Sequence, residues 1–412
     1  MTRRVLIRAT GAARPGQLAG LGQAMARSGA RLLDINQSVT FGMLSLEALV
    51  GLEHDSDLEG ALAEAGDSLG LAVQAIQVSA EEYQRWSGQA GEPRLILTLL
   101  APHLPAGILA EVGALTAEYG LTVELIHRLS GRESLDGGVP RSHHNVQGAC
   151  VECWLRGAEV DLESLREKTL ALGAMHGVDI AVQEDSIWRR HRRLVCFDMD
   201  STLIQAEVID ELARRHGVYA EVAAITERAM RGELDFQQSF RERMAKLEGL
   251  DEAVLAEIAD ELPLMDGVER LMRHLKRLGY RTAILSGGFT YFARHLQQKL
   301  GFDEIHANEL VIENGKVTGE VREPILDASR KAELLREIAA REGFSMEQTI
   351  AVGDGANDLK MLAAAGLGIA YRAKPLVRSQ ARQSISTLGL DAVLYLMGYR
   401  EGDLKDDSRA AQ

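Results

Sequence analysis

Three short apolar runs in the carboxyl-terminal half of the chain each stop abruptly at polar residues. The runs are Leu194–Phe197, Arg281–Leu285 and Thr349–Val352. Strands of a parallel sheet are buried on both faces, so they form continuous apolar runs of this length rather than alternating patterns. Ligands of such sheets bind just beyond the carboxyl ends of the strands. The pattern therefore predicts an α/β fold with a parallel sheet and a polar site where these strands end.

The amino-terminal half shows a different pattern, in which strand-like and helical segments follow one another in the order βαββαβ. In the first copy, strands are expected at 3–13, 30–40, 43–51 and 72–78, with helices after Pro15-Gly16 and at 57–69. The order starts again after residue 93, with strands at 94–100, 121–129, 148–155 and 178–183 and helices after residue 105 and at 161–173. A repeat of about ninety residues indicates duplicated small domains. This order is that of a ferredoxin-like α+β sandwich.

Residues between the first and second apolar runs have almost purely helical periodicity. Four helices are expected, at 208–216, 218–230, 236–247 and 251–262. An insertion of this kind after the first strand is interpreted as a helical cap, from about residue 204 to 265. The predicted organisation is ferredoxin-like domains at 1–88 and 89–185, a catalytic domain at 186–400 and a flexible polar tail at 401–412. Asn314-Gly315 predicts a tight hairpin turn.

Composition and charge restrict the class of function. The 412 residues are 46% hydrophobic and 26% charged, as in soluble globular proteins. The formal net charge of −14 argues against nucleic-acid binding, which depends on Lys and Arg. The basic run within 184–193 is therefore expected to be a solvated linker. No apolar stretch reaches the roughly 18 residues of a membrane span. Three cysteines do not make a disulfide framework, so a cytoplasmic location is expected.

The acids behind the apolar runs suit phosphoryl transfer. A carboxylate at Asp198 can attack phosphorus and form an aspartyl phosphate, which divides hydrolysis into two easier steps. Because the nucleophile and a phosphate ester are both anionic, their charge must be neutralised, and Mg²⁺ prefers carboxylates, waters and phosphate oxygens. Asp198 and Asp354 are the expected side-chain ligands of Mg²⁺, with the backbone carbonyl of Asp200. Asp358 is expected to form hydrogen bonds to these ligands or to metal-bound waters without binding the metal itself.

The remaining polar residues have complementary tasks. The Asp200 side chain is free to protonate the leaving oxygen and then to deprotonate the attacking water. Ser286, with the amides of Gly287 and Gly288 at a helix start, is expected to bind the phosphoryl oxygens. Lys331, on the first turn of a helix, adds positive charge at the end where the helix dipole has the same sign.

These motifs resemble those of the haloacid-dehalogenase superfamily of phosphotransferases, and within it the phosphoserine phosphatases. They are Asp198-Met199-Asp200-Ser201-Thr202, Ser286-Gly287-Gly288, Lys331 and Gly353-Asp354-Gly355-Ala356-Asn357-Asp358, in the family order. Without the family pattern, surface charge on a helix is the simpler interpretation of Glu207 and Arg243. The resemblance instead implies that Glu207 pairs with the ammonium of phosphoserine and that Arg243 binds its carboxylate as a planar fork. It also implies an apolar wall at Phe236 and a substrate contact at Asn357.

The amino-terminal repeat resembles two ACT domains, small modules that usually bind amino acids at their interfaces. The resemblance rests on Arg14-Pro15-Gly16-Gln17-Leu18 and Leu33-Asp34-Ile35-Asn36-Gln37, and it is weaker at Pro105-Ala106-Gly107, where an alanine is inserted. Gly16 and Gly107 are either positions where the backbone approaches a ligand closely or ordinary glycines at helix starts. The resemblance implies serine or another amino acid as an effector, and a homodimer.

The sequence is consistent with three functions. The leading hypothesis is Mg²⁺-dependent hydrolysis of O-phospho-L-serine through an aspartyl phosphate, which in this family is the last step of serine biosynthesis. The alternative is a phosphatase with the same chemistry that acts on another phospho-metabolite or on a phosphoprotein. An amino-acid-binding regulator with a vestigial catalytic half is disfavoured, because Asp198, Asp200, Lys331 and Asp354 are all present.

Overall fold

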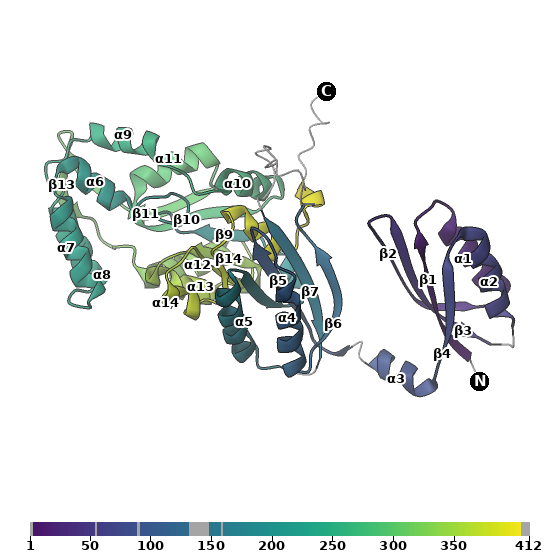
Figure 1. Ribbon diagram of the computed structural model, residues 1–412. Coiled ribbons are helices and arrows are strands. Elements are labelled where there is room, and N and C mark those ends of the chain that lie inside the picture. The colour runs from purple at the N-terminus through teal and green to yellow at the C-terminus, as the bar shows by residue number, and fades with distance from the viewer. Residues whose placement is uncertain (1–2, 54–55, 89–90, 132–147, 158–159, 405–412) are drawn as a thin grey trace, which may run out of the picture. The chain divides into compact units, whose positions relative to one another are not determined.

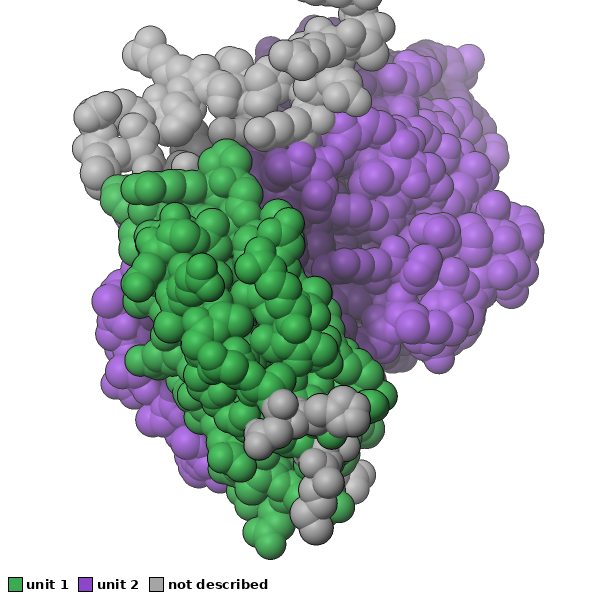
Figure 2. All heavy atoms as spheres, turned by 90° about the vertical axis from the view of Figure 1, so that its right-hand side faces the viewer, with its two compact units in different colours: residues 1–92 green, residues 93–412 purple. Residues whose placement is uncertain are grey.

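The chain divides into two compact units, residues 1–92 and residues 93–412 (Figure 2). The computed structural model describes residues 3–53, 56–88, 91–131, 148–157 and 160–404. Within these ranges, no helix combines the length and the apolar character needed to cross a lipid bilayer.

Unit 1 is an α+β sandwich with the predicted order of elements. These are β1 (Arg3–Ala12), α1 (Gln17–Arg27), β2 (Arg31–Thr40), β3 (Met43–Leu52), α2 (Leu58–Leu69) and β4 (Ala72–Val78). The strands form an antiparallel sheet in the order β2-β3-β1-β4, with α1 and α2 on one face (Figure 1). Val5, Ile7 and Ala9 of β1 are buried against these helices, because alternate side chains of a strand point to the same face. A further helix, α3 (Ala80–Gly88), follows β4; it buries no residue, and the apolar pattern did not predict it.

The same fold recurs at the start of unit 2. Its elements are β5 (Arg94–Ala101), α4 (Gly107–Glu118), β6 (Thr122–Arg128), β7 (Ala149–Arg156), α5 (Leu162–His176) and β8 (Asp179–Glu184). The strand order β6-β7-β5-β8 corresponds position by position to the order in unit 1. The predicted pair of ferredoxin-like folds is therefore confirmed.

The two copies differ in what covers their sheets. All residues of β5 from Leu95 to Ala101 are buried, whereas burial alternates along β1. Leu97 and Leu99 pack with the helices of their own domain. Leu100 belongs to the same apolar cluster as the catalytic sheet. The second copy thus packs against the catalytic domain through the sheet face opposite its helices.

Side chains also join strand β8 to the catalytic sheet. The Gln383 amide donates to the carbonyl of Val182 at 2.7 Å and accepts from its N–H at 3.1 Å. The Asp179 carboxylate accepts from the N–H groups of Ser386 and Thr387 at 2.7 and 2.8 Å. The Gln383 bonds satisfy the backbone of Val182 on the edge strand β8, which would otherwise be open, and the Asp179 bonds satisfy two N–H groups just after β16.

The catalytic domain contains a six-stranded parallel sheet in the order β11-β10-β9-β14-β15-β16. The strands are β9 (Leu194–Phe197), β10 (Arg281–Phe289), β11 (Glu304–Asn308), β14 (Thr349–Gly353), β15 (Leu367–Tyr371) and β16 (Gln383–Ile385). One face packs against α10 (Val268–Arg277) and α11 (Thr290–Leu300), and the other against α12 (Ala328–Arg341), α13 (Leu359–Ala364) and α14 (Pro375–Gln380). The short helix α15 (Val393–Leu396) follows. Both faces are therefore buried, as the continuous apolar runs predicted.

The predicted helical cap is present between β9 and β10. It consists of α6 (Val208–His216), α7 (Tyr219–Met230), α8 (Phe236–Ala245) and α9 (Ala253–Glu261) (Figure 1). The predicted hairpin is also confirmed and pairs β12 (Leu310–Glu313) with β13 (Lys316–Val321). Its turn residues Asn314 and Gly315 have φ angles of 52° and 76°, the left-handed conformation that favours Asn and Gly.

Two segments that were predicted to be solvated are held in the fold instead. In the basic linker, Arg189 is only 3% exposed and is paired with the buried Glu152 of β7. At the start of the predicted flexible tail, Glu401 is bonded to Arg270 at 3.0 Å and Leu404 is buried. The linker prediction fails at Arg189 and the tail prediction at residues 401–404, because local charge composition does not reveal a partner of opposite charge on a distant element. Residues 405–412 of the predicted tail lie outside the described residues.

Candidate active site

The polar ends of three neighbouring strands meet at one edge of the parallel sheet. β9 pairs with β10 on one side and with β14 on the other. Asp198 directly follows β9, Ser286 lies in the last part of β10, and Asp354 directly follows β14. The N–H of Asp198 donates to the carbonyl of Val352 at 2.9 Å and so continues the ladder by one residue. The parallel topology thus brings together residues that are far apart in the sequence.

A buried lysine lies between two carboxylates of this site. Lys331 Nζ is 2.8 Å from Asp198 Oδ1 and 2.7 Å from Asp358 Oδ1, and its side chain is 0% exposed. Burial alone lowers the pKa of this ammonium, but the two carboxylates outweigh burial and hold the pKa above its ordinary value. Asp327 caps the first turn of α12 with its side chain and so orients the turn from which Lys331 extends.

Asp198, Asp354 and Asp358 form a cluster in which one oxygen of each carboxylate lies within 4.8 Å of the others. Thr202 Oγ1 donates to Asp354 at 2.9 Å, and the N–H of Gly355 donates to Asp358 at 2.9 Å. Burial, followed by the charges of Asp198 and Asp358, raises the pKa of Asp354 to about 8. An all-oxygen donor set suits a hard divalent cation such as Mg²⁺, and its charge would relieve the repulsion. The residues therefore fit a metal site.

Asp200 lies beside this cluster and close to the loop at the end of β10. A Cβ atom at Gly288 would be 2.7 Å from Met199 Cε and 3.1 Å from Asp200 Oδ2, so glycine leaves room for this carboxyl beside the end of β10. Burial is the main reason why the pKa of Asp200 lies well above its ordinary value. The negative charges of Glu207 and Asp198 raise this pKa further. A hydrogen bond from the backbone N–H of Val208 lowers it, but by less. A raised pKa favours the protonated form of this carboxyl, as a proton donor requires.

Ser286–Gly288, the irregular last part of β10 (the Ser286–Gly288 loop), is buried except at the half-buried Gly287. Ser286 is 0% exposed, and its Oγ accepts a hydrogen bond from the N–H of Gly288 at 3.0 Å. The pairing of β10 with β11 is regular up to Leu285 and resumes at Phe289, with an irregularity between them. The helix that was predicted to begin at this loop, α11, begins at Thr290. The loop amides therefore lie just before a helix rather than within its first turn.

Glu207 and Arg243, the predicted cap residues of opposite charge, influence each other electrostatically. Burial raises the pKa of Glu207, although Ser201 Oγ donates to its carboxylate at 2.8 Å. Burial lowers the pKa of Arg243, and the carboxylates of Asp210 and Glu207 oppose this shift. An exposed carboxylate, Glu207, and a half-buried guanidinium, Arg243, are thus available on the cap.

Phe236 and Asn357 complete the predicted set. Phe236 stacks on Phe240 with ring centroids 6.1 Å apart. Its ring would be 3.4 Å from a Cβ atom at Gly287, so the cap contacts the loop of β10. The half-buried Asn357 folds its side chain over Gly355, where a Cβ atom would collide with it.

Three polar residues to which the sequence pattern gave no role contact the predicted ones. Ser201, with a left-handed φ of 57°, bonds Glu207, and Thr202 bonds Asp354. Asp210 lies in the electrostatic environment of Arg243. Its spacing of three residues from Glu207 could have indicated this, because residues three apart on a helix share a face.

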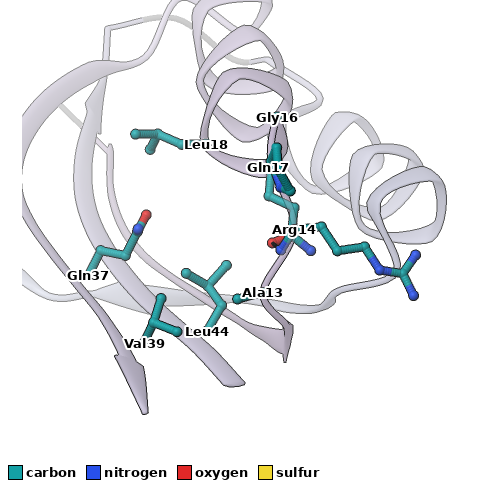
Figure 3. Close-up of a pocket in the computed structure, with 9 residues that line it drawn as sticks. Ala13, Arg14, Gly16, Gln17, Leu18, Gln37, Val39 and Leu44 are labelled. Atoms are coloured by element: carbon teal, nitrogen blue, oxygen red, sulfur yellow. Dashed lines mark hydrogen bonds between the residues drawn. The ribbon is translucent and has the colours of Figure 1, made fainter. Parts of the chain in front are cut away.

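Unit 1 has a pocket of its own at the predicted Gly16 (Figure 3). The cavity is about 280 Å³ and is lined by Ala13, Arg14, Pro15, Gly16, Gln17, Leu18, Gln37, Val39 and Leu44. Gly16 has a φ of 89° and precedes α1, a conformation that favours glycine. Gly107, by contrast, begins α4 after an Ala106 with ordinary helical backbone angles. The two predicted regulatory glycines are therefore not structurally equivalent.

The fold and the site define a haloacid-dehalogenase-like hydrolase with attached ACT-type domains. The family model for haloacid dehalogenase-like hydrolases matches residues 192–366, and the ACT domain model matches residues 3–75. The chain is 41% identical to the phosphoserine phosphatase of Streptomyces coelicolor, over 96% of this chain and 92% of that protein. It is 38% identical to phosphoserine phosphatase SerB2 of Mycobacterium tuberculosis, over 97% and 94%. The chain belongs to the phosphoserine phosphatase family.

Solved structures show the same relationship. A haloacid-dehalogenase family hydrolase from Salmonella enterica serovar Typhi aligns with a TM-score of 0.62 and 30% identity, covering 73% of this chain and 98% of that one. A probable phosphoserine phosphatase from Vibrio cholerae, in an unliganded form, aligns with a TM-score of 0.57 and 34% identity, covering 74% and 86%.

The close approach of the Asp198, Asp354 and Asp358 carboxylates predicts that the stability of the folded protein depends on pH and on bound Mg²⁺. Folding raises the pKa of Asp354 from an ordinary 3.8 to about 8. Its contribution to stability is therefore full below about pH 4 and is lost as the pH rises toward about 8. In EDTA, the melting temperature should fall between about pH 5 and about pH 8. Saturating Mg²⁺ should raise it by at least about 4 °C at the higher pH and by less at the lower pH.

Differential scanning calorimetry at both pH values, with and without Mg²⁺, measures this effect. Asp354→Asn, which removes one of the repelling charges, should reduce the pH dependence in EDTA. Equal Mg²⁺-induced shifts at both pH values would contradict the assignment of this cluster.

Proposed function

We propose that the protein hydrolyses O-phospho-L-serine to L-serine and inorganic phosphate through an aspartyl phosphate on Asp198, the last step of serine biosynthesis. The observation that carries this proposal is the position of Asp198 directly after β9, within the carboxylate cluster and 2.8 Å from Lys331 Nζ. The similarity to phosphoserine phosphatases over nearly the whole chain supports the choice of substrate.

In the first step, Asp198 acts as the nucleophile. Its Oδ1 accepts hydrogen bonds from Lys331 Nζ and from the N–H of Met199 at 2.8 Å, which leaves Oδ2 to attack. A bond forms between this oxygen and phosphorus, and the bond between phosphorus and the seryl oxygen breaks. Asp200, whose raised pKa lets it carry a proton, protonates the seryl oxygen as it leaves.

In the second step, water attacks the phosphorus and the bond to Asp198 breaks. Asp200 accepts a proton from this water, which restores both carboxyl groups for the next turnover. Lys331, the Ser286 hydroxyl and the amide of Gly287 bind the phosphoryl oxygens in both steps. Catalysis of phosphoryl transfer is largely positioning and charge stabilisation, which these fixed donors provide.

Mg²⁺ is the proposed cofactor. The carboxylates of Asp198 and Asp354 and the backbone carbonyl of Asp200 would hold it, with Asp358 supporting them while bound to Lys331. When bound, the ion neutralises the charge between the anionic nucleophile and the phosphate ester.

The cap is proposed to select the amino-acid part of the substrate. Glu207 pairs with the ammonium group and Arg243 with the carboxylate, each partly removed from water. Phe236 provides an apolar wall beside Gly287, and Asn357, in the Gly353–Asp358 motif, is proposed to contact the substrate. Charge-assisted hydrogen bonds of this kind are roughly twice as strong as bonds between neutral groups.

Replacing the nucleophile should abolish turnover without unfolding the protein. Asp198→Asn should lower kcat on phosphoserine by at least about ten-thousandfold, because an amide cannot form the acyl phosphate. Circular dichroism should be unchanged, since the amide has the same shape as the carboxylate. Rapid quenching with radiolabelled phosphoserine should label residue 198 of the unmodified protein. Retained turnover in the variant, or label on another residue, would contradict the assignment.

Removing the cap arginine should affect one substrate selectively. Arg243→Ala should lower kcat/KM for phosphoserine by about a hundredfold or more, since the carboxylate of the bound substrate loses its bidentate partner. It should change kcat/KM for p-nitrophenyl phosphate, which has no carboxylate, much less. Arg241→Ala, on the same helix but exposed and paired with Glu323, is the matched control. Equal losses on both esters would favour a different phosphate ester as the substrate.

We also propose that the ACT-type half binds an amino-acid effector, serine being the first candidate, at the pocket of unit 1. Titration calorimetry of the full chain with serine should show binding that Gln37→Ala, in the pocket lining, weakens about tenfold. Gln74→Ala, on the exposed part of β4, should leave the affinity unchanged. Absence of heat with all common amino acids would overturn this proposal.

The homodimer implied by the ACT resemblance is proposed on the same basis. Strand β2 is exposed almost throughout and carries the exposed apolar side chains of Leu32, Ile35 and Val39. An exposed edge strand of this kind favours association. A light-scattering mass of one chain at micromolar concentration would exclude a stable dimer.

A further inference from the structure

Asn308, at the end of β11, makes two hydrogen bonds between segments that do not pair directly at this point. Its side-chain Nδ2 donates to the carbonyl of Gly287 at 2.8 Å, and its Oδ1 accepts from the N–H of Leu326 at 2.7 Å. The residue is only 3% exposed. A buried side-chain amide in such a position satisfies two backbone groups that would otherwise lack partners.

The first of these bonds lies at the irregularity in the central sheet. The pairing between β10 and β11 is regular up to Leu285 and resumes where Phe289 faces Asn308. Gly287 lies in the interrupted part, and its carbonyl accepts from the side-chain amide of Asn308, the last residue of β11. Asn308 therefore holds the Ser286–Gly288 loop in a conformation that the strand pairing itself does not impose.

The second bond reaches the segment that leads to the buried lysine. Leu326 immediately precedes Asp327, which caps α12 and thereby orients the turn that bears Lys331. Through one side chain, the loop with Ser286 and the start of the helix with Lys331 are held at a fixed separation. These two segments supply the donors assigned above to the phosphoryl oxygens.

The cap contacts the same two segments. The ring of Phe236 lies against Gly287, and the side chain of Gln237 donates to Asp327 at 3.4 Å. Asn308 and the cap thus contact the same two segments, the end of β10 and the start of α12.

We infer that Asn308 is a positioning residue for phosphoryl-group binding, acting through Gly287 and Leu326 without touching the substrate; the inference rests on the proposed phosphatase function. Without its amide, the Gly287 carbonyl and the Leu326 N–H lose their buried partner and the loop is free to shift. Phosphoryl transfer is sensitive to displacements of about 1 Å, so kcat/KM should fall by about ten- to a hundredfold.

The test compares Asn308→Leu with a matched variant, Gln383→Leu. Gln383 is also buried and also bonds both the N–H and the carbonyl of the backbone, but at Val182, on the boundary between β8 and β16. Both variants lose a side-chain amide that bridges two buried backbone groups. Purified full-length proteins are compared for melting temperature, kcat and KM on phosphoserine, inhibition by inorganic phosphate and activation by Mg²⁺.

Asn308→Leu should lower kcat/KM by about ten- to a hundredfold and weaken inhibition by inorganic phosphate by a similar factor, with the Mg²⁺ activation constant within about twofold of the unmodified protein. Both leucine variants should lower the melting temperature by a similar amount. Gln383→Leu should leave kcat, KM and the phosphate inhibition constant within about twofold of the unmodified protein. Asn308→Ser, which keeps a small hydrogen-bonding group, should show an intermediate loss and provides the measurement if the leucine variant does not fold.

Equal kinetic losses in the two matched variants would overturn the inference, because they would indicate general destabilisation. Unchanged phosphate inhibition in the Asn308 variants would overturn it as well. The unmodified protein is assayed first on phosphoserine. Absence of turnover there would count against the proposed function, whereas activity there combined with unaffected Asn308 variants would count against this inference alone.

Discussion

A buried ammonium among buried carboxylates is the interaction on which the catalytic half of the molecule depends. Lys331 Nζ contacts Asp198 and Asp358 at 2.8 and 2.7 Å in a region from which water is excluded. Removing these charges from water is costly, and the mutual contacts offset that cost only while every partner stays in place. The third carboxylate, Asp354, accepts a hydrogen bond from Thr202, and no lysine or arginine of the described residues is paired with it. The cluster is therefore electrostatically incomplete in a way that a divalent cation would complete.

The rest of the catalytic domain holds these few charges in position. β9 is four residues long and fully buried, so Asp198 starts from a rigid strand. Glycines at 288 and 353 let neighbouring carboxyl groups approach the backbone, since a Cβ atom at either position would be in close contact with Asp200 or Asp358. The cap adds groups of opposite charge above the site. The same end of the sheet thus provides both the chemistry and, as proposed, the recognition of the amino-acid part of the substrate.

The two ferredoxin-like copies have diverged in their surroundings. The first forms a separate compact unit and has a pocket beside Gly16. The second shares an apolar cluster with the catalytic sheet and is bonded to it by Gln383 and Asp179. The face of its sheet opposite its helices is therefore covered by the catalytic domain. Duplication of one fold has thus produced one unit with an open pocket and one that is structurally part of the catalytic domain.

Much of this organisation was present in the sequence because it depends on local pattern. The apolar runs ending in acids, the repeated βαββαβ order, the helical insertion and the Asn314-Gly315 turn each reflect the conformational preferences of neighbouring residues, and the resemblance to known motifs indicated the site residues. The pairing of Asp358 with Lys331, the burial of Arg189 against Glu152 and the bridge made by Asn308 were not predictable in this way. In each of them a polar group gains its partner from an element distant along the chain, and only the folded structure decides which charges and amides are removed from water together.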